Sequence, residues 1–192
     1  MVDPSNGYEG AAYEFLEHRG SSNIGVATVR AWGRSLPTGA AVLDLGCGSG
    51  LPISRTLMDQ GIAVYGVDSS RTLCAAFSRN CPTANVACES VEESSFFRRE
   101  FDGVIAWGLI FLLRAESQLT LIHRVARTLS QSGRFLFTAP TQACNWVDVL
   151  TGRTSQAAGD AAYRAALEAS GLLLIAEHID EGENHYYDTA KR

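Results

Sequence analysis

The chain has 192 residues, enough for one well-buried domain and too few for two of typical size. Its net charge of -5, without any cluster of Lys or Arg, argues against a nucleic-acid-binding protein. It has no apolar run of ~18 residues that could span a membrane, no signal segment, and no CxxC pair among its five cysteines, so we expect a cytoplasmic protein that does not bind membranes.

Helical and strand patterns alternate along the chain. The predicted helices cover residues 10–19, 24–36, 52–60, 70–80, 115–129 and 160–170. Ser22 or Asn23 is the expected N-cap of the second helix. The predicted strands cover residues 41–45, 62–67, 85–88, 102–107, 134–139, 172–179 and 185–189. The last two strands are separated only by a turn at residues 180–183.

This alternation determines the expected fold. Strands that are joined by helices pair in parallel, because each helix returns the chain to the same end of the sheet. The last two strands have no helix between them, so they should pair antiparallel. The sequence therefore predicts a single-domain, Rossmann-like three-layer α/β sandwich over residues 1–192. Its seven-stranded sheet should be mostly parallel, with one antiparallel strand near the C-terminus and ligands at the carboxyl ends of the strands.

The stretch VLDLGCGSG, residues 42–50, follows the first predicted strand. Its glycines, Gly46, Gly48 and Gly50, allow positive φ and let a ligand approach the backbone closely. A dinucleotide site requires the spacing G-x-G-x-x-G, which is absent here. Asp44 precedes the glycines and would repel a phosphate, so it favours a cation such as an ammonium group, or a hydroxyl donor. The alternative is a tight strand–helix turn without a ligand.

Polar residues also follow the second and third predicted strands. Asp68 and Ser69 end the second strand, where a carboxylate can accept both hydroxyls of a ribose. The alternative role for Asp68 is to cap the next helix. After the third strand, Glu89 could accept the amino group of a base while Val91 covers its face. The alternative there is a solvated acidic loop.

In combination, these motifs resemble those of the class I S-adenosylmethionine-dependent methyltransferases. The resemblance covers roughly residues 40–140 and includes VLDLGCGSG, GVDSS, FDGVIAWGLIFLL and SGRFLFTAP. It implies S-adenosyl-L-methionine as cofactor, S-adenosyl-L-homocysteine as product, and no metal. The cofactor contacts that it implies are Asp44, Gly46, Cys47, Gly48, Gly50, Asp68, Ser69, Glu89, Ser90, Val91, Trp107 and Gly108.

The resemblance assigns a place to each of these residues. Gly46 and Gly48 would contact the methionine part of the cofactor, and Asp44 would lie near its amino group. Asp68 would hold the ribose, residues 89–91 would border the adenine, and residues 107–108 would line the floor near the sulfonium. The chain departs from the family in two places. Glu89-Ser90 stands where Asp and a small residue are usual, and the apolar residues 109–113 stand where a histidine is frequent.

The expected acceptor is a small molecule. Methyltransferases that act on the amino groups of nucleic-acid bases usually carry an Asn/Asp-Pro-Pro-aromatic motif where this chain has Trp107-Gly108-Leu109-Ile110. The apolar residues 110–113 suit an apolar acceptor, although they could instead pack against the next helix. The helices of residues 1–38 and the insert at residues 141–159 are the expected covers. The insert carries the candidate substrate-binding residues Trp146 and Asp148.

His185 is the candidate for proton transfer or substrate contact, because the reversed strand should begin at the ligand-binding end of the sheet. The alternatives are that His185 packs under a helix or balances Asp180 or Glu183. Should His185 have no such role, the remaining candidates for a general base are Tyr8, Tyr13, His18 and Asp148.

Three functions stay open. The first is a small-molecule methyltransferase, acting as a monomer or homodimer. The second is a dehydrogenase or other dinucleotide enzyme, which the glycine spacing disfavours. The third is a regulatory module that binds the cofactor without turnover. Sequence cannot separate the first from the third, because methyl transfer requires chiefly alignment and exclusion of water rather than one obligatory side chain.

Overall fold

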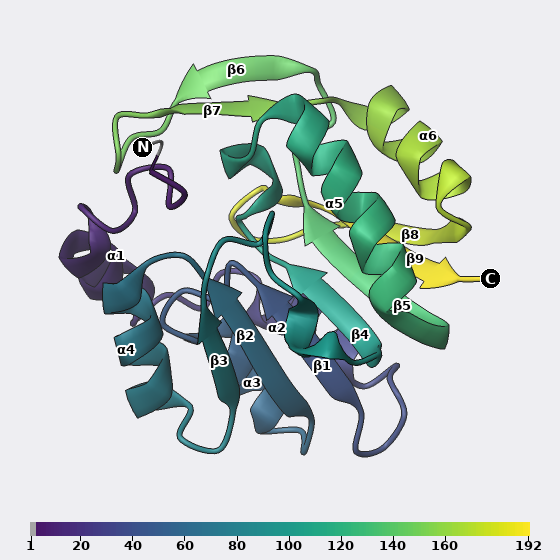
Figure 1. Cartoon of the computed structure of the whole chain (residues 1–192), viewed down its shortest axis with the longest axis horizontal. Helices are drawn as coiled ribbons and strands as arrows, with labels where there is room; N and C mark the ends of the chain where they lie inside the picture. Colours follow the sequence, from purple (N-terminus) through teal and green to yellow (C-terminus); the bar gives the residue numbers. More distant parts are fainter. Residues whose placement is uncertain (1–2) are drawn as a thin grey trace.

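The computed structural model describes residues 3–192 and is built around a seven-stranded sheet in the order β3-β2-β1-β4-β5-β9-β8 (Figure 1). Six of the seven strands run parallel, and β9 pairs antiparallel with both of its neighbours, β5 and β8. The predicted fold class is therefore confirmed. The sheet strands are β1 (Ala41–Leu45), β2 (Ala63–Asp68), β3 (Asn85–Cys88), β4 (Phe101–Ala106), β5 (Leu129–Thr138), β8 (Leu172–Ile179) and β9 (His185–Lys191).

Helices cover both faces of the sheet. They are α1 (Ala12–Arg19), α2 (Val26–Gly33), α3 (Ile53–Met58), α4 (Arg71–Asn80), α5 (Ala115–Thr128) and α6 (Asp160–Ala169), with short 3-10 turns η1 (Phe96–Arg98) and η2 (Ile110–Leu112). No helix within residues 3–192 is long and apolar enough to cross a bilayer. Each predicted helix is present, with ends that differ by at most three residues from the predicted ones.

The alternation of strand side chains creates two cores. On one face, Leu43, Phe137 and Tyr187 pack with residues of α5 and α6. On the other face, Trp32 of α2 and Tyr186 of β9 belong to a second buried cluster. Neighbouring residues of β9 therefore serve opposite layers, as the period of two requires.

The start of α2 differs from the prediction. Its N-cap is Gly25, with φ of +83° and no side-chain cap, rather than Ser22 or Asn23. A Cβ on Gly25 would lie 2.6 Å from Trp107 Nε1 and 2.6 Å from the Tyr186 hydroxyl. Glycine is required here because both the backbone conformation and the close neighbours exclude a side chain.

The insert at residues 141–159 forms a separate two-stranded hairpin, β6 (Cys144–Val147) and β7 (Thr154–Ala157), whose strands the sequence did not reveal. In Figure 1 the hairpin lies beside the N-terminal segment. Two hydrogen bonds confirm this proximity: the Tyr8 hydroxyl donates to Asp148 at 3.2 Å, and the Asn6 amide donates to the Thr154 carbonyl at 3.5 Å. The first described residues and the hairpin are thus joined.

Candidate active site

A cavity of about 180 Å³ lies at the carboxyl ends of β1, β2 and β4, where an α/β sheet binds its ligands. Segments far apart in the sequence form its wall, including the N-terminal segment, α1, the glycine turn after β1 and the η2 turn after β4. Most of the predicted cofactor-contacting residues line it: Asp44, Gly46, Cys47, Gly48, Asp68, Ser69, Val91, Trp107 and Gly108. The fold therefore gathers at one place residues that were singled out from separate motifs.

The glycine turn presents bare backbone to the cavity. Gly46 and Gly48 have φ values of +69° and +53°, in the left-handed region that favours glycine. A Cβ on Gly48 would lie 3.3 Å from the ring of Phe15, within the cavity wall. Gly50 also has positive φ, but its missing side chain leaves room for the Cys81 sulfur, and it does not line the cavity.

Asp44 is a buried carboxylate that borders the cavity, with 2% of its surface exposed. Its Oδ2 accepts a hydrogen bond of 2.5 Å from the Ser54 hydroxyl, and Oδ1 has no donor among residues 3–192. Burial, with a smaller effect from the charge of Asp68, raises the pKa of Asp44 to about 7, although the Ser54 bond opposes this. A positively charged ligand group would satisfy this site.

Asp68 connects the glycine turn to the start of α4. Its Oδ2 accepts from the Gly48 amide at 2.9 Å and its Oδ1 from the Ser70 amide at 2.8 Å. Burial raises the pKa of Asp68, while these backbone bonds act in the opposite direction. The side-chain cap of α4 is Ser70, whose hydroxyl accepts from the Leu73 amide at 3.1 Å. Asp68 therefore keeps free lone pairs at the cavity, because each carboxylate oxygen can accept two hydrogen bonds.

The loop after β3 contributes only in part to the cavity. Val91 is buried and lines it, whereas Glu89 and Ser90 do not. Glu89 is exposed and its amide donates to the Asp68 carbonyl at 2.9 Å. The Ser90 hydroxyl accepts from the Glu92 amide at 3.1 Å.

The residues after β4 are held by a chain of hydrogen bonds. Trp107 Nε1 donates to the Tyr186 hydroxyl at 2.6 Å, and that hydroxyl donates to Asp180 at 2.6 Å. The Gly108 amide donates to the Thr138 hydroxyl at 2.8 Å. A Cβ on Gly108 would meet no atom within 4 Å, so this backbone faces open space at the cavity.

The cavity also includes Arg19 and Phe15 of α1, which sequence reasoning missed. Tyr8, one of the remaining candidates for a general base, lines the cavity as well. The sequence predicted a cover there, but no motif spacing identifies which of its side chains face inward. Ordinary helical periodicity cannot show this, because α1 is short and mostly polar.

Trp146 and Asp148 lie one step away from the cavity. Trp146 contacts the ring of Phe111, which lines the cavity, with ring centroids 5.4 Å apart. Asp148 accepts from the amides of Leu150 and Thr151, so it holds the hairpin turn in addition to its bond with Tyr8. Their proximity to the cavity arises through neighbours rather than by direct contact.

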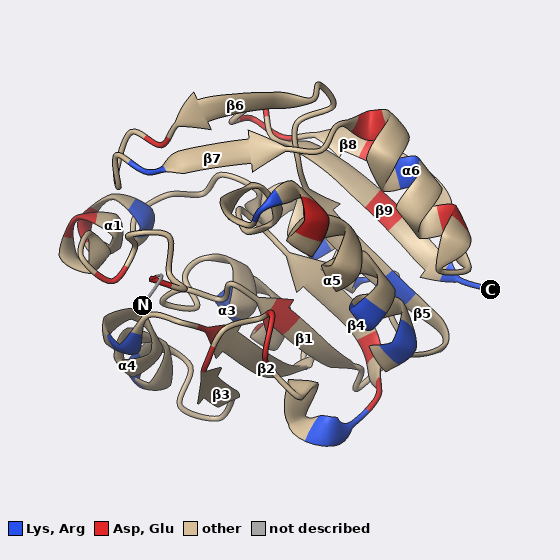
Figure 2. Ribbon diagram, turned by 45° about the horizontal axis from the view of Figure 1, so that its top comes forward, with Lys and Arg blue, Asp and Glu red and all other residues tan. Residues whose placement is uncertain are grey.

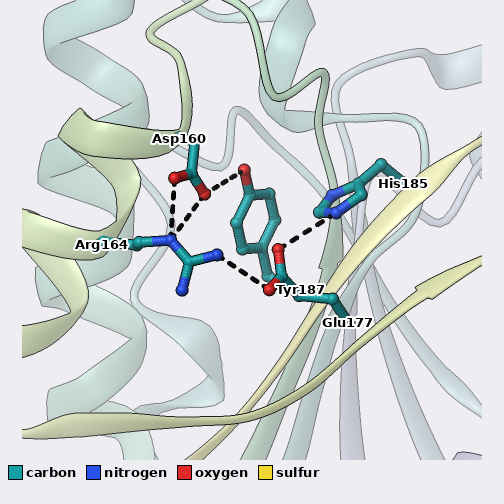
Figure 3. Close-up of polar contacts among 5 residues, drawn as sticks. All are labelled: Asp160, Arg164, Glu177, His185 and Tyr187. Carbon is teal, nitrogen blue, oxygen red and sulfur yellow. Dashed lines mark hydrogen bonds and ion pairs between the residues drawn. The ribbon is translucent and has the colours of Figure 1, made fainter.

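His185 lies in a different cluster, shown in Figure 3. Its Nε2 is 3.2 Å from Glu177 Oε1, and its ring contacts that of Tyr187. Arg164 bonds both Glu177 and Asp160 at 2.8 Å. Strand alternation directs Tyr186 into the second core, where it bonds Trp107, and His185 toward the opposite face of the sheet; neither side chain lines the cavity.

Comparisons with known proteins agree with this geometry. A sequence model of the family described as "Methyltransferase domain" matches residues 42–133. No curated protein matches the chain. Among solved structures, magnesium protoporphyrin IX methyltransferase from Synechocystis PCC 6803 with bound S-adenosylhomocysteine (SAH) has a TM-score of 0.82 at 17% identity, with 100% of each chain covered.

Two further solved structures have the same fold. The CcbJ methyltransferase from Streptomyces caelestis has a TM-score of 0.77 at 15% identity, covering 100% of this chain and 99% of that one. The amino pentose methyltransferase CalS10 from Micromonospora echinaspora, solved with bound S-adenosylmethionine (SAM), has a TM-score of 0.73 at 15% identity, covering 94% and 96%. Together with the domain match over residues 42–133 and the sheet with one reversed strand, they show that this chain has the Rossmann-like fold of these methyltransferases.

Proposed function

We propose that the protein binds SAM in the cavity and transfers its methyl group to a small-molecule acceptor, releasing SAH. The observation that carries this proposal is the meeting of Asp44, the Gly46–Gly48 turn and Asp68 at adjacent strand ends around one cavity. The solved structures of related fold that were crystallised with SAM or SAH support it.

The residues present suit the chemical groups of this cofactor. Asp44, which has one unused oxygen and a raised pKa, suits the ammonium group of the methionine part. Asp68 has lone pairs for the two ribose hydroxyls, and the buried side chain of Val91 suits the face of the adenine. Trp107 and Gly108 would lie near the sulfonium. Gly50, Glu89 and Ser90 stand outside the cavity and are not part of this assignment.

The chain's own residues would act mainly by alignment and by exclusion of water. The bound cofactor supplies a methyl group that is already activated by its sulfonium. The η2 turn supplies an apolar wall through Phe111, Leu112 and Leu113, which suits an apolar part of the acceptor. The N-terminal residues and the β6–β7 hairpin form the cover, although residues 1 and 2 of the expected cover lie outside the described residues. This arrangement holds the reacting groups together and dry.

A small-molecule acceptor also agrees with the charges. Lys and Arg residues, blue in Figure 2, are spread over α3, α4, α5 and α6 rather than along one element. The net charge of -5 likewise disfavours binding to nucleic acid. The proposed working unit is a monomer or homodimer.

Calorimetry with SAM, SAH and NADH tests the cofactor, and a screen of small molecules with a methyl-labelled donor tests turnover. Binding of SAM and SAH, followed by label transfer, is the expected result. Binding of NADH alone would contradict the proposal. Binding of SAM without transfer to any acceptor would favour a regulatory module that retains the cofactor site.

A further inference from the structure

Arg19 places a buried positive charge in the cavity wall. It is the last residue of α1, only 9% of its surface is exposed, and it borders the cavity. Its guanidinium carbon lies 3.8 Å from the centre of the Trp107 ring. It donates to the Ser22 hydroxyl at 3.0 Å and to the Ile24 carbonyl at 3.2 Å. The group is thus held in one place beside Trp107.

No carboxylate forms an ion pair with Arg19 among residues 3–192. Asp180 and Glu181 are the carboxylates whose charges attract Arg19, but both have other hydrogen-bond partners. Asp180 accepts from the Tyr186 hydroxyl and Asn184, and Glu181 accepts from the Gly25 amide at 3.2 Å. Burial lowers the pKa of Arg19 to about 10, against the attraction of these groups. Arg19 therefore remains charged at neutral pH.

The contacts within the protein leave part of this charged group unused. The Ser22 hydroxyl and the Ile24 carbonyl need only neutral donors, whereas a buried cation without a paired anion costs free energy. A guanidinium carries five N–H donors in a planar fork that matches a carboxylate. Two of its nitrogens have acceptors within residues 3–192, so further donors remain for a ligand in the cavity.

We propose that Arg19 binds a carboxylate group of a small molecule in this cavity. The carboxylate has two possible sources: the amino-acid end of the cofactor, an assignment that rests on the proposed function, or an anionic acceptor. Both have the same chemistry at Arg19. Because Trp107 lies directly under the guanidinium, the bound carboxylate would be close to the residues assigned to the sulfonium.

The first arm of the test measures the affinities of SAM and decarboxylated SAM for the wild type and for Arg19→Gln by calorimetry. If the carboxylate is that of the cofactor, the wild type should bind SAM at least tenfold more tightly than decarboxylated SAM, and Arg19→Gln should lose this preference. The second arm measures binding of benzoate and neutral benzamide by ligand-detected NMR, with and without SAH. If the carboxylate is that of an acceptor, Arg19→Gln should lose benzoate binding, while its relative affinity for SAM and decarboxylated SAM should equal that of the wild type.

Three variants separate binding from folding. Arg99→Gln is the matched control, because Arg99 also stacks on an aromatic ring, that of Tyr65, but lies outside the cavity. Ser22→Ala removes an acceptor of Arg19 and keeps the charge. Neither should alter carboxylate selectivity. Should Arg19→Gln fail to fold, Arg19→Lys serves in its place, since it keeps a charge but loses the fork.

The arms also separate failure of this proposal from failure of the proposed function. A wild type that binds neither form of SAM would contradict the function, and the benzoate arm would still decide the role of Arg19. The role of Arg19 is overturned when folded Arg19 variants, like the Arg99 control, keep both the SAM preference and the benzoate binding of the wild type.

Discussion

Trp107 Nε1 donates a hydrogen bond of 2.6 Å to the hydroxyl of Tyr186, which connects the end of β4 to the beginning of β9. The same hydroxyl donates to Asp180, and burial with this acidic partner raises the pKa of Tyr186, so the hydroxyl stays protonated at neutral pH. The orientation of Trp107 in the cavity wall therefore depends on a residue 79 positions later in the chain.

Tyr186→Phe should weaken SAH binding and lower the free energy of unfolding by about 1–3 kcal/mol, because it leaves Trp107 Nε1 and Asp180 without this partner. Calorimetry and chemical denaturation measure the two effects. Tyr187→Phe is the matched control: its hydroxyl donates to Asp160 on the opposite face, so it should affect stability alone. Equal SAH affinity in both variants would contradict the role of Tyr186.

Asp44→Asn should make the ligand-free protein more stable at pH 8 and weaken its binding of SAH. The pKa of Asp44 is raised to about 7 in the folded state from an ordinary 3.8. Asp44 therefore makes its full contribution to the free energy of unfolding below about pH 4, and this contribution is lost as the pH rises through about 7. At pH 8 the free energy of unfolding of Asp44→Asn should exceed that of the wild type by on the order of 2–4 kcal/mol.

The same ionisation predicts that the wild type binds SAH more tightly as the pH rises from 6 to 8, since an ammonium group requires the charged carboxylate. Asp44→Asn should lose this part of the pH dependence. Denaturation and calorimetry between pH 5 and 8 measure both quantities. A pH dependence of SAH affinity that is the same in the variant and the wild type would exclude Asp44 as the ammonium partner.

Gly48→Val should abolish SAH binding in protein that still folds, because a side chain would fill the space beside Phe15 and strain a backbone with φ of +53°. Gly61→Val is the matched control. Gly61 has φ of +80° with open space around it, so the control carries similar strain outside the cavity. Circular dichroism and calorimetry should show lower stability in both variants and lost SAH binding only in Gly48→Val.

Tyr8→Phe should accelerate dissociation of SAH several-fold, because the bond from Tyr8 to Asp148 joins the N-terminal segment to the hairpin. The loss of this bond should cost about 0.5–1.5 kcal/mol. Stopped-flow displacement of SAH measures the rate. Tyr13→Phe is the control, since Tyr13 is 77% exposed, and it should dissociate at the wild-type rate.

His185→Gln should leave SAH affinity and methyl transfer close to those of the wild type, because His185 pairs with Glu177 away from the cavity. The measurement is turnover across pH 6–9, once an acceptor is known. A large fall in turnover with normal SAH affinity would instead support proton transfer by His185.

The sequence predicted the sheet because its strands are short apolar runs with clear boundaries. Even the reversed strand followed from the short turn at residues 180–183, which leaves no room for a helix. The hairpin β6–β7 was missed because CNWV is largely exposed, and because the buried positions of TSQA are the small residues Ser155 and Ala157, so neither segment carries a regular alternation of large apolar residues. A small hairpin outside the main sheet leaves little pattern in a sequence.

The cavity was predictable where a strand end fixes a residue, as for Asp44, Asp68 and Trp107. The cavity was not predictable where the packing of helices against the sheet determines which side chains line it. Arg19 enters the cavity because α1 folds over the sheet edge, and nothing in its local sequence specifies that direction. His185 shows a related limit: strand alternation separates it from Tyr186, but only the assembled sheet shows that Tyr186 bonds Trp107 of the cavity wall whereas His185 pairs with Glu177.

The insertion of β9 between β5 and β8 has a consequence for folding. One edge of β5 stays unpaired until β9, about fifty residues later in the chain, pairs with it, as the register of Phe137 with Tyr187 shows. Until then this edge is open to pairing with other chains, and such distant contacts form slowly. The same insertion delivers Tyr186 to Trp107. One late step therefore protects the sheet from aggregation and completes the cavity wall.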